Sequence, residues 1–114
     1  MPLYMATFGY SPETWSSLIK SPENREETVR RIMDEAGCKL HHLWYAFGDA
    51  DGFAVIEAPE NATAAGVVLA ITASGAFRSF KTTVLMTMEE TLEALDKAGS
   101  ITYSAPGARQ PAHA

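Results

Sequence analysis

The stretch from Cys38 to Pro59 constrains the fold most strongly, because two runs of strand-forming residues flank a short polar turn. The turn reads Gly48-Asp49-Ala50-Asp51-Gly52, and Asp and Gly tolerate the positive φ angles that short hairpin turns require. The flanking runs are rich in side chains that suit a pleated sheet, namely Leu40, Leu43, Trp44, Tyr45, Phe47, Phe53, Val55 and Ile56. The segment therefore predicts a β-hairpin.

Size and composition predict one folded domain, residues 1–99, followed by an extended or disordered tail, residues 100–114. The 114 residues are 46% hydrophobic and 20% charged, which is typical of a single soluble domain. The tail contains Pro106, Gly107 and Pro111 among small residues. A formal net charge of -5 argues against nucleic acid or an anionic membrane surface as a partner, since both bind clustered Lys and Arg.

The cysteine content and the N-terminal segment predict a cytoplasmic protein. Cys38 is the single cysteine and no motif near it indicates an activated thiol, so we expect a small, semi-buried apolar residue. The N-terminal segment lacks the basic stretch and apolar run of a signal peptide. No apolar stretch approaches the roughly 20 residues of a membrane-spanning helix.

The first half of the chain predicts a strand and then two helices. Leu3 to Tyr10 is dense in apolar and aromatic residues and predicts a strand. Ser11-Pro12-Glu13 and Ser21-Pro22-Glu23 each place a capping hydroxyl before a proline and an acid, which is typical of a helix start. We expect a short helix from the first and a long one from the second, ending at Gly37.

The second half predicts a helix, a strand and a final helix. Ala62 to Ser74 has little polar face, so we expect that helix to be buried on most sides. Phe77 to Thr87 predicts the last strand. Thr87-Met88-Glu89-Glu90 matches a capping box and predicts a helix that ends at Gly99. The order is βαββαβ with an extra C-terminal helix, which predicts an α+β, ferredoxin-like antiparallel sheet with helices on one face.

Alternation along the hairpin predicts which side chains face the helices. One side of the sheet receives Leu40, His42, Trp44 and Ala46 with Phe53, Val55 and Glu57. The other side receives the more uniformly apolar set Leu43, Tyr45, Phe47, Ala54, Ile56 and Ala58, which we assign to the core beneath the helices. The first set then lies on the open side, and covering its apolar residues predicts a homodimer or a higher homo-oligomer.

The chain resembles the GYD domain family over most of its first ninety residues. The matching segments are Pro2-Leu3-Tyr4, Gly37 to Leu40, Gly48-Asp49-Ala50-Asp51 at the signature turn, Glu57-Ala58-Pro59 and Lys81-Thr82-Thr83-Val84-Leu85. Ala50 stands where the family usually has Tyr, so that ring is absent here or is supplied by Phe53 or Tyr45. The resemblance implies a ferredoxin-like fold of the dimeric α/β-barrel type and no defined activity.

The candidate catalytic residues are His42 and Glu57 on the predicted open side, with His42 as a general base that Glu57 orients. A histidine and a glutamate that satisfy each other at a subunit interface are the structural alternative. The candidate ligand-binding residues are Trp44, Phe53, Tyr4 and Lys81, although Lys81 could equally pair with an acidic residue of a partner.

No metal or cofactor is predicted. His41 is expected to point to the opposite side from His42, so the two imidazoles cannot bind one metal ion from a regular strand. Asp49 and Asp51 lack the further oxygen ligands of a calcium loop. No phosphate loop or dinucleotide fingerprint is present.

Two classes of function are compatible with this sequence. The first is a protein that binds a small hydrophobic or aromatic molecule in a pocket on the open side, either without catalysis or as a cofactor-independent monooxygenase, isomerase or lyase with His42 as base. The second is a non-catalytic assembly or regulatory module whose open side is filled by its partner. The mixed polar and aromatic lining of His42, Trp44 and Glu57 favours ligand binding.

Overall fold

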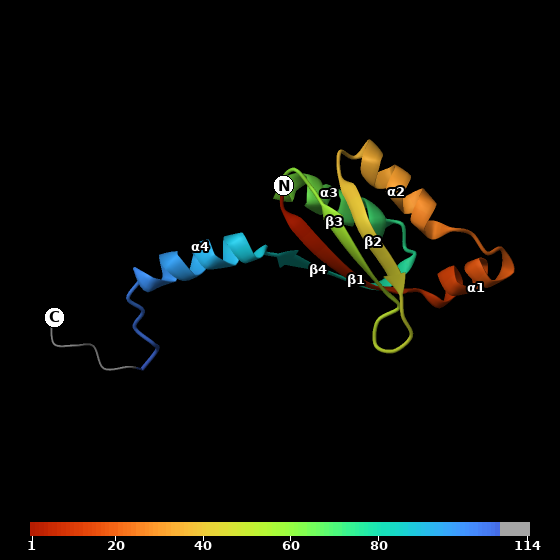
Figure 1. Ribbon diagram of the computed structural model, residues 1–114. Helices are drawn as coiled ribbons and strands as arrows, with labels where there is room; N and C mark the ends of the chain where they lie inside the picture. Colours follow the sequence, from red (N-terminus) through yellow and green to blue (C-terminus); the bar gives the residue numbers. More distant parts are fainter. Residues whose placement is uncertain (108–114) are drawn as a thin grey trace.

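The computed structural model describes residues 1–107 and shows a mixed α+β fold with a four-stranded antiparallel sheet and four helices (Figure 1). The elements are, in order, β1 (Leu3–Tyr10), α1 (Pro12–Lys20), α2 (Arg25–Glu35), β2 (Lys39–Tyr45), β3 (Gly52–Glu57), α3 (Asn61–Ala73), β4 (Phe77–Leu85) and α4 (Met88–Gly99). The predicted α+β class with an antiparallel sheet is confirmed. Residues 100–107 form no helix or strand, and residues 108–114 of the predicted tail lie outside the described residues. The division into a domain and a tail stays a prediction.

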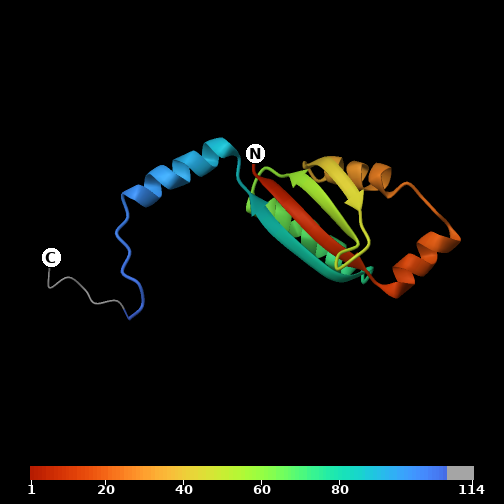
Figure 2. The ribbon, with the colours of Figure 1, turned by 60° about the horizontal axis from the view of Figure 1, so that its bottom comes forward.

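The strands lie in the order β2-β3-β1-β4, so β1 pairs with both β3 and β4. Side chains alternate along β1: Tyr4, Ala6 and Phe8 are buried, whereas the residues between them are only partly buried. Helices α2 and α3 both lie on the face that Tyr4, Ala6 and Phe8 occupy (Figure 2). We call the opposite side the open face; it carries Leu3, Met5, Thr7, His42, Trp44, Phe53, Val55, Glu57, Lys81 and Thr83.

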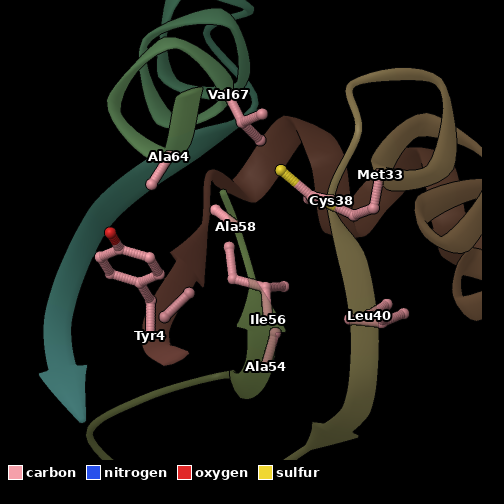
Figure 3. Close-up of a cluster of buried hydrophobic side chains, with 10 residues drawn as sticks. Tyr4, Met33, Cys38, Leu40, Ala54, Ile56, Ala58, Ala64 and Val67 are labelled. Atoms are coloured by element: carbon pink, nitrogen blue, oxygen red, sulfur yellow. The ribbon is translucent and has the colours of Figure 1, made fainter. Parts of the chain in front are cut away.

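The core forms between the sheet and α2 and α3, as Figure 3 shows. Met33 comes from α2 and Ala64 and Val67 from α3. Cys38 is buried in the same cluster, and the strands and the end of β3 supply Tyr4, Ala6, Leu40, Ala54, Ile56 and Ala58. Several core positions carry alanine in place of a large side chain. This leaves space between the sheet and the helices.

A β-bulge at His41 corrects the predicted faces of β2. The predicted hairpin is confirmed, but its pairing runs from Trp44 opposite Phe53 to His42 opposite Val55, and then to Leu40 opposite Ile56. His41 is the extra residue, and an extra residue reverses the alternation of the strand beyond it. Leu40 is therefore 1% exposed in the core, and its predicted place on the open side is wrong.

The hairpin loop is longer than the predicted turn. The strands end at Tyr45 and resume at Gly52, so residues 46–51 form the loop, closed by the Ala46 amide that donates to the Asp51 carbonyl at 2.8 Å. Phe47 was expected in the core but is fully exposed at the tip of this loop. Strand β2 therefore ends at Tyr45, two residues before Phe47, the last strand-forming residue ahead of the polar turn.

The structure confirms two of the three predicted helix starts. Ser11 caps α1, and Thr87 with Glu90 forms the predicted capping box of α4. The second predicted start is wrong, because Ser21 ends α1 and Asn24 caps α2 by accepting a hydrogen bond from the Glu27 amide. Gly37 follows α2 with a φ of 78°, a conformation that favours glycine.

Helix α3 is much more exposed than its composition predicts. Only Ala64 and Val67 are buried, and Leu69 is 67% exposed, so the expectation of burial on most sides is wrong for a single chain. Helix α4 has no buried residue and points away from the sheet (Figure 1). Within residues 1–107, no helix has both the length and the apolar character needed to cross a membrane.

The close packing of Gly52 against Phe8 generates a test of the hairpin register. A Cβ atom at Gly52 would lie 2.3 Å from Cζ of Phe8, whereas a Cβ at Gly48 would meet nothing within 4 Å. Gly52→Ala should therefore lower the free energy of unfolding by about 1–3 kcal/mol, since buried overpacking forces shifts in the core. Gly48→Ala is the control and should leave stability unchanged or slightly higher in urea unfolding. Equal stabilities would contradict the register.

Candidate functional site

A cavity lies between the sheet and helices α1, α2 and α3, and we call it the helix-side cavity. Its volume is about 810 Å³. Its floor is the helix-covered face of the sheet, which contributes Ala6, Phe8, Leu43, Ala54, Ile56 and Phe80. Its walls come from the helices and include Leu18, Val29, Ile32, Met33, Gly66, Val67 and Ile71. Apolar side chains dominate the lining, as in most small-molecule sites.

Small residues account for the empty space. Ala6 and Ala54 sit opposite each other on β1 and β3, and Gly66 faces the cavity from α3. A Cβ atom at Gly66 would meet no heavy atom within 4 Å. Larger side chains at these positions would close the gap between sheet and helices, so the cavity is a direct consequence of the local sequence.

One end of the cavity carries polar groups. Tyr10, Thr14 and Ser17 line it together with Glu23 and Arg25, whose side chains form an ion pair at 3.1 Å. The Tyr10 hydroxyl is hydrogen-bonded to the Tyr45 hydroxyl at 3.0 Å. Partial burial, followed by this hydrogen bond, raises the pKa of Tyr45. A ligand at this end meets hydroxyl groups and the ion pair of Arg25 with Glu23.

Asp51 fixes the structure around that polar end. Its carboxylate accepts hydrogen bonds from the Tyr10 amide at 2.8 Å and from Trp15 Nε1 at 3.1 Å. Arg78 Nη2 lies 3.5 Å from the same oxygen. These contacts join the hairpin loop to β1, α1 and β4. The hydrogen bond from Trp15, the amide of Tyr10 and the charge of Arg78 lower the pKa of Asp51.

Five of the six predicted site residues lie on the open face, away from the helix-side cavity. His42 stacks on Trp44 with ring centroids 4.6 Å apart, and Phe53 lies opposite Trp44 on β3. Lys81 lies opposite Thr7, and Thr7 opposite Phe53. Tyr4 is instead buried beneath α3, and its hydroxyl donates to Asn61 Oδ1 at 2.5 Å. None of the six lines the helix-side cavity.

Glu57 pairs with His41, not with His42. The N–H at Nε2 of His41 donates to Glu57 Oε1 at 2.8 Å, and this hydrogen bond is the main reason that the pKa of Glu57 is lowered. The bulge brings His41 to the open side, so the expectation that it points to the opposite side is wrong. Glu57 therefore hydrogen-bonds to His41 and does not orient His42 as predicted. A role for His42 as a base stays a prediction.

The chemistry available in the cavity is recognition by shape and by a few hydrogen bonds. Within the described chain, no three His, Cys, Asp or Glu side chains gather closely enough to hold a metal ion. Sequence reasoning missed the cavity because it assigned Leu43, Ala54 and Ile56 to a filled core. The signal was present in the small residues Ala6, Ala54 and Gly66 along apolar elements.

Comparison with known proteins supports both the family resemblance and the fold. The family model of the GYD domain matches residues 4–95. The crystal structure of MtbAldR is similar with a TM-score of 0.59 and 12% sequence identity, which is a likeness of fold. The match covers 75% of this chain and 53% of MtbAldR, so this chain spans about half the length of that protein. No curated protein matches this sequence.

The Asp51 contacts generate a prediction on pH. A carboxylate whose pKa is lowered on folding stabilises the folded state above its ordinary pKa of about 3.9, and this contribution is lost as the pH falls through the lower folded value. Asp51→Asn should therefore lower the Tm at pH 7, and the difference from the parent should shrink below about pH 4. Asp49→Asn, in the same exposed loop, is the matched control for removing one charge. A Tm difference that is constant with pH would contradict the assignment.

Proposed function

This chain belongs to the GYD domain family, and we propose that it binds a small hydrophobic or aromatic molecule in the helix-side cavity. The observation that carries the proposal is the cavity itself, because its volume of about 810 Å³ falls in the range of roughly 300–1,000 Å³ that is typical of ligand sites. The lining combines apolar walls with convergent polar groups at one end, the other general feature of such sites.

The lining indicates the chemical class of the ligand. Phe8, Tyr10, Phe77 and Phe80 contribute aromatic rings to the floor, and rings pack favourably against other rings edge to face. Thr14, Ser17 and the Tyr10 hydroxyl can hydrogen-bond one polar substituent. We therefore infer a flat apolar ligand that carries a single polar or anionic group toward Arg25.

The helix-side cavity lies on the opposite side of the sheet from the open face, where the sequence predicted a pocket. Three of the five candidate residues on the open face contact a neighbour there: Glu57 pairs with His41, and His42 stacks on Trp44. The cavity of about 810 Å³ lies on the side of the sheet that the helices cover. Binding without catalysis is the reading that this arrangement supports best.

We further propose that the strand order corresponds to the ferredoxin-like arrangement and that the open face pairs with a second copy, as in a dimeric α/β barrel. Trp44 is 57% exposed there, beside half-buried Phe53 and Val55. Burying side chains of this size stabilises by about 1.5–3 kcal/mol each relative to full exposure. A second open face offers a matching apolar surface, and a two-fold axis closes the assembly.

A cavity-filling variant tests the binding proposal. Gly66→Leu adds a side chain where a Cβ atom meets open space, so it should fill the cavity and leave the fold intact. We expect its affinity for an apolar fluorescent probe, 8-anilinonaphthalene-1-sulfonate, to fall at least about tenfold, equivalent to about 1.4 kcal/mol. Ala62→Leu, an exposed position on the same helix that does not line the cavity, is the matched control. Equal probe affinity in both variants would place the ligand elsewhere.

A charge on the open face tests the proposed pairing of sheets. Trp44→Glu should halve the molar mass in light scattering, because an unpaired carboxylate cannot be buried between two apolar faces without a large cost. Phe47→Glu introduces the same charge at a fully exposed loop position and should leave the mass unchanged. If Trp44→Glu keeps the parent mass, the open face is not the contact.

A further inference from the structure

Helix α4 presents an apolar stripe that no other part of residues 1–107 covers. Met88, Leu92 and Leu95 follow the i, i+4, i+7 spacing of one helix face. They are 71%, 59% and 62% exposed, and no residue of α4 is buried. Figures 1 and 2 show α4 pointing away from the sheet and from the other helices. An amphipathic helix of this kind is stable in water mainly through packing of its apolar face, so a partner surface is required.

A second uncovered apolar surface lies beside β4. A groove of about 370 Å³ runs between α3 and β4, lined by Tyr4, Asn61, Ala64, Ala65, Val68, Leu69 and Thr82. Helix α3 carries no charged residue along its length, although Leu69 is well exposed. Val84 extends the groove along β4 on the same face as Thr82. A helix that is apolar all round is normally buried, which indicates that this groove is covered in the assembled protein.

The stripe and the groove belong to one chain but do not meet within it. Only Met86 and Thr87 separate the end of β4 from the start of α4. The reciprocal bonds between Thr87 and Glu90 hold Thr87 in an extended conformation, with φ -69° and ψ 166°. This short, capped connection directs α4 outward from the edge of the sheet, away from the groove.

We propose that α4 of each chain packs into the α3–β4 groove of a second copy. A two-fold axis near Met86 and Thr87 would place the partner's α4 along the β4 edge of this chain. The same axis would place this chain's α4 along the β4 edge of the partner. The acidic side chains Glu89, Glu93 and Asp96 then face solvent, since the groove contains no charged residue. The contact is self-complementary, which identifies the occupant as this chain itself.

The area that this exchange buries suits a stable interface. Beyond α4, Ile101 and Tyr103 are also exposed apolar residues. In and beside the groove that would receive α4, the exposed apolar residues are Leu69, Val84 and Met86. With the α4 stripe, these eight side chains offer about 100 Å² of apolar surface each when fully exposed. At their observed exposures they bury on the order of 1,000 Å² in the reciprocal pair, which is the size expected of a specific contact. The exchange uses neither the helix-side cavity nor the open face, so it stands independently of the proposed function.

The oligomeric state of full-length variants tests the exchange. Leu92→Glu places a carboxylate in the stripe and should lower the molar mass measured by light scattering, because it removes the contact through α4 and leaves only the proposed open-face contact. Ala94→Glu adds the same charge to an exposed position on another side of α4 and should leave the mass unchanged. Circular dichroism checks that both variants keep the parent helix content. An unchanged mass for Leu92→Glu would overturn the proposal.

Crosslinking of mixed chains identifies which copy α4 contacts. Chains with Leu92→Cys and chains with Leu69→Cys are mixed, equilibrated and treated with a short bis-maleimide, with the parent chain as the control for buried Cys38. We expect a covalent dimer that contains one chain of each variant, at a yield several-fold above that of either variant alone. In a single chain that carries both substitutions, an intrachain link as the main product at high dilution would show that α4 folds back on its own α3, and it would overturn the exchange.

Discussion

The sheet of this protein carries large apolar side chains on both faces, but within residues 1–107 helices cover only one of them, and this imbalance governs the rest of the structure. Strand β1 lies at the centre and sends Tyr4, Ala6 and Phe8 toward the helices. The opposite face carries Trp44, Phe53 and Val55 with no helix over it. Because apolar surface is driven out of water at roughly 25 cal/mol per Å², this uncovered face favours the proposed pairing with a second copy.

The helix layer is itself incompletely filled, and that is the origin of the candidate site. Asp51 joins the hairpin loop, Trp15 and the end of β1, so the loop and α1 are held at one end of the sheet. Between α2 and α3, small side chains at Ala54 and Gly66 leave a cavity of about 810 Å³ in place of a close-packed interior. Rigid support at one end and open space beside it are the usual conditions for ligand binding.

Sequence patterns predicted the α+β class, the hairpin, the cap at Ser11 and the capping box at Thr87, because these depend on local periodicity and on single residues. They failed at His41, since one bulged residue reverses the alternation and no local signal distinguishes it from a regular strand position. That error moved Leu40 out of the core and paired Glu57 with the wrong histidine. The cavity was missed for a different reason: apolar composition predicts burial on average, but empty volume depends on how side chains from distant segments meet.

Native mass spectrometry of the protein purified from cells is the sharpest test of whether the helix-side cavity holds a small molecule. One spectrum gives both the number of chains in the assembly and any retained ligand. We expect an oligomer with a discrete additional mass of a small organic molecule for each chain. Bare chains, together with no mass increase after incubation with aromatic acids and phenols, would contradict a binding function for the cavity.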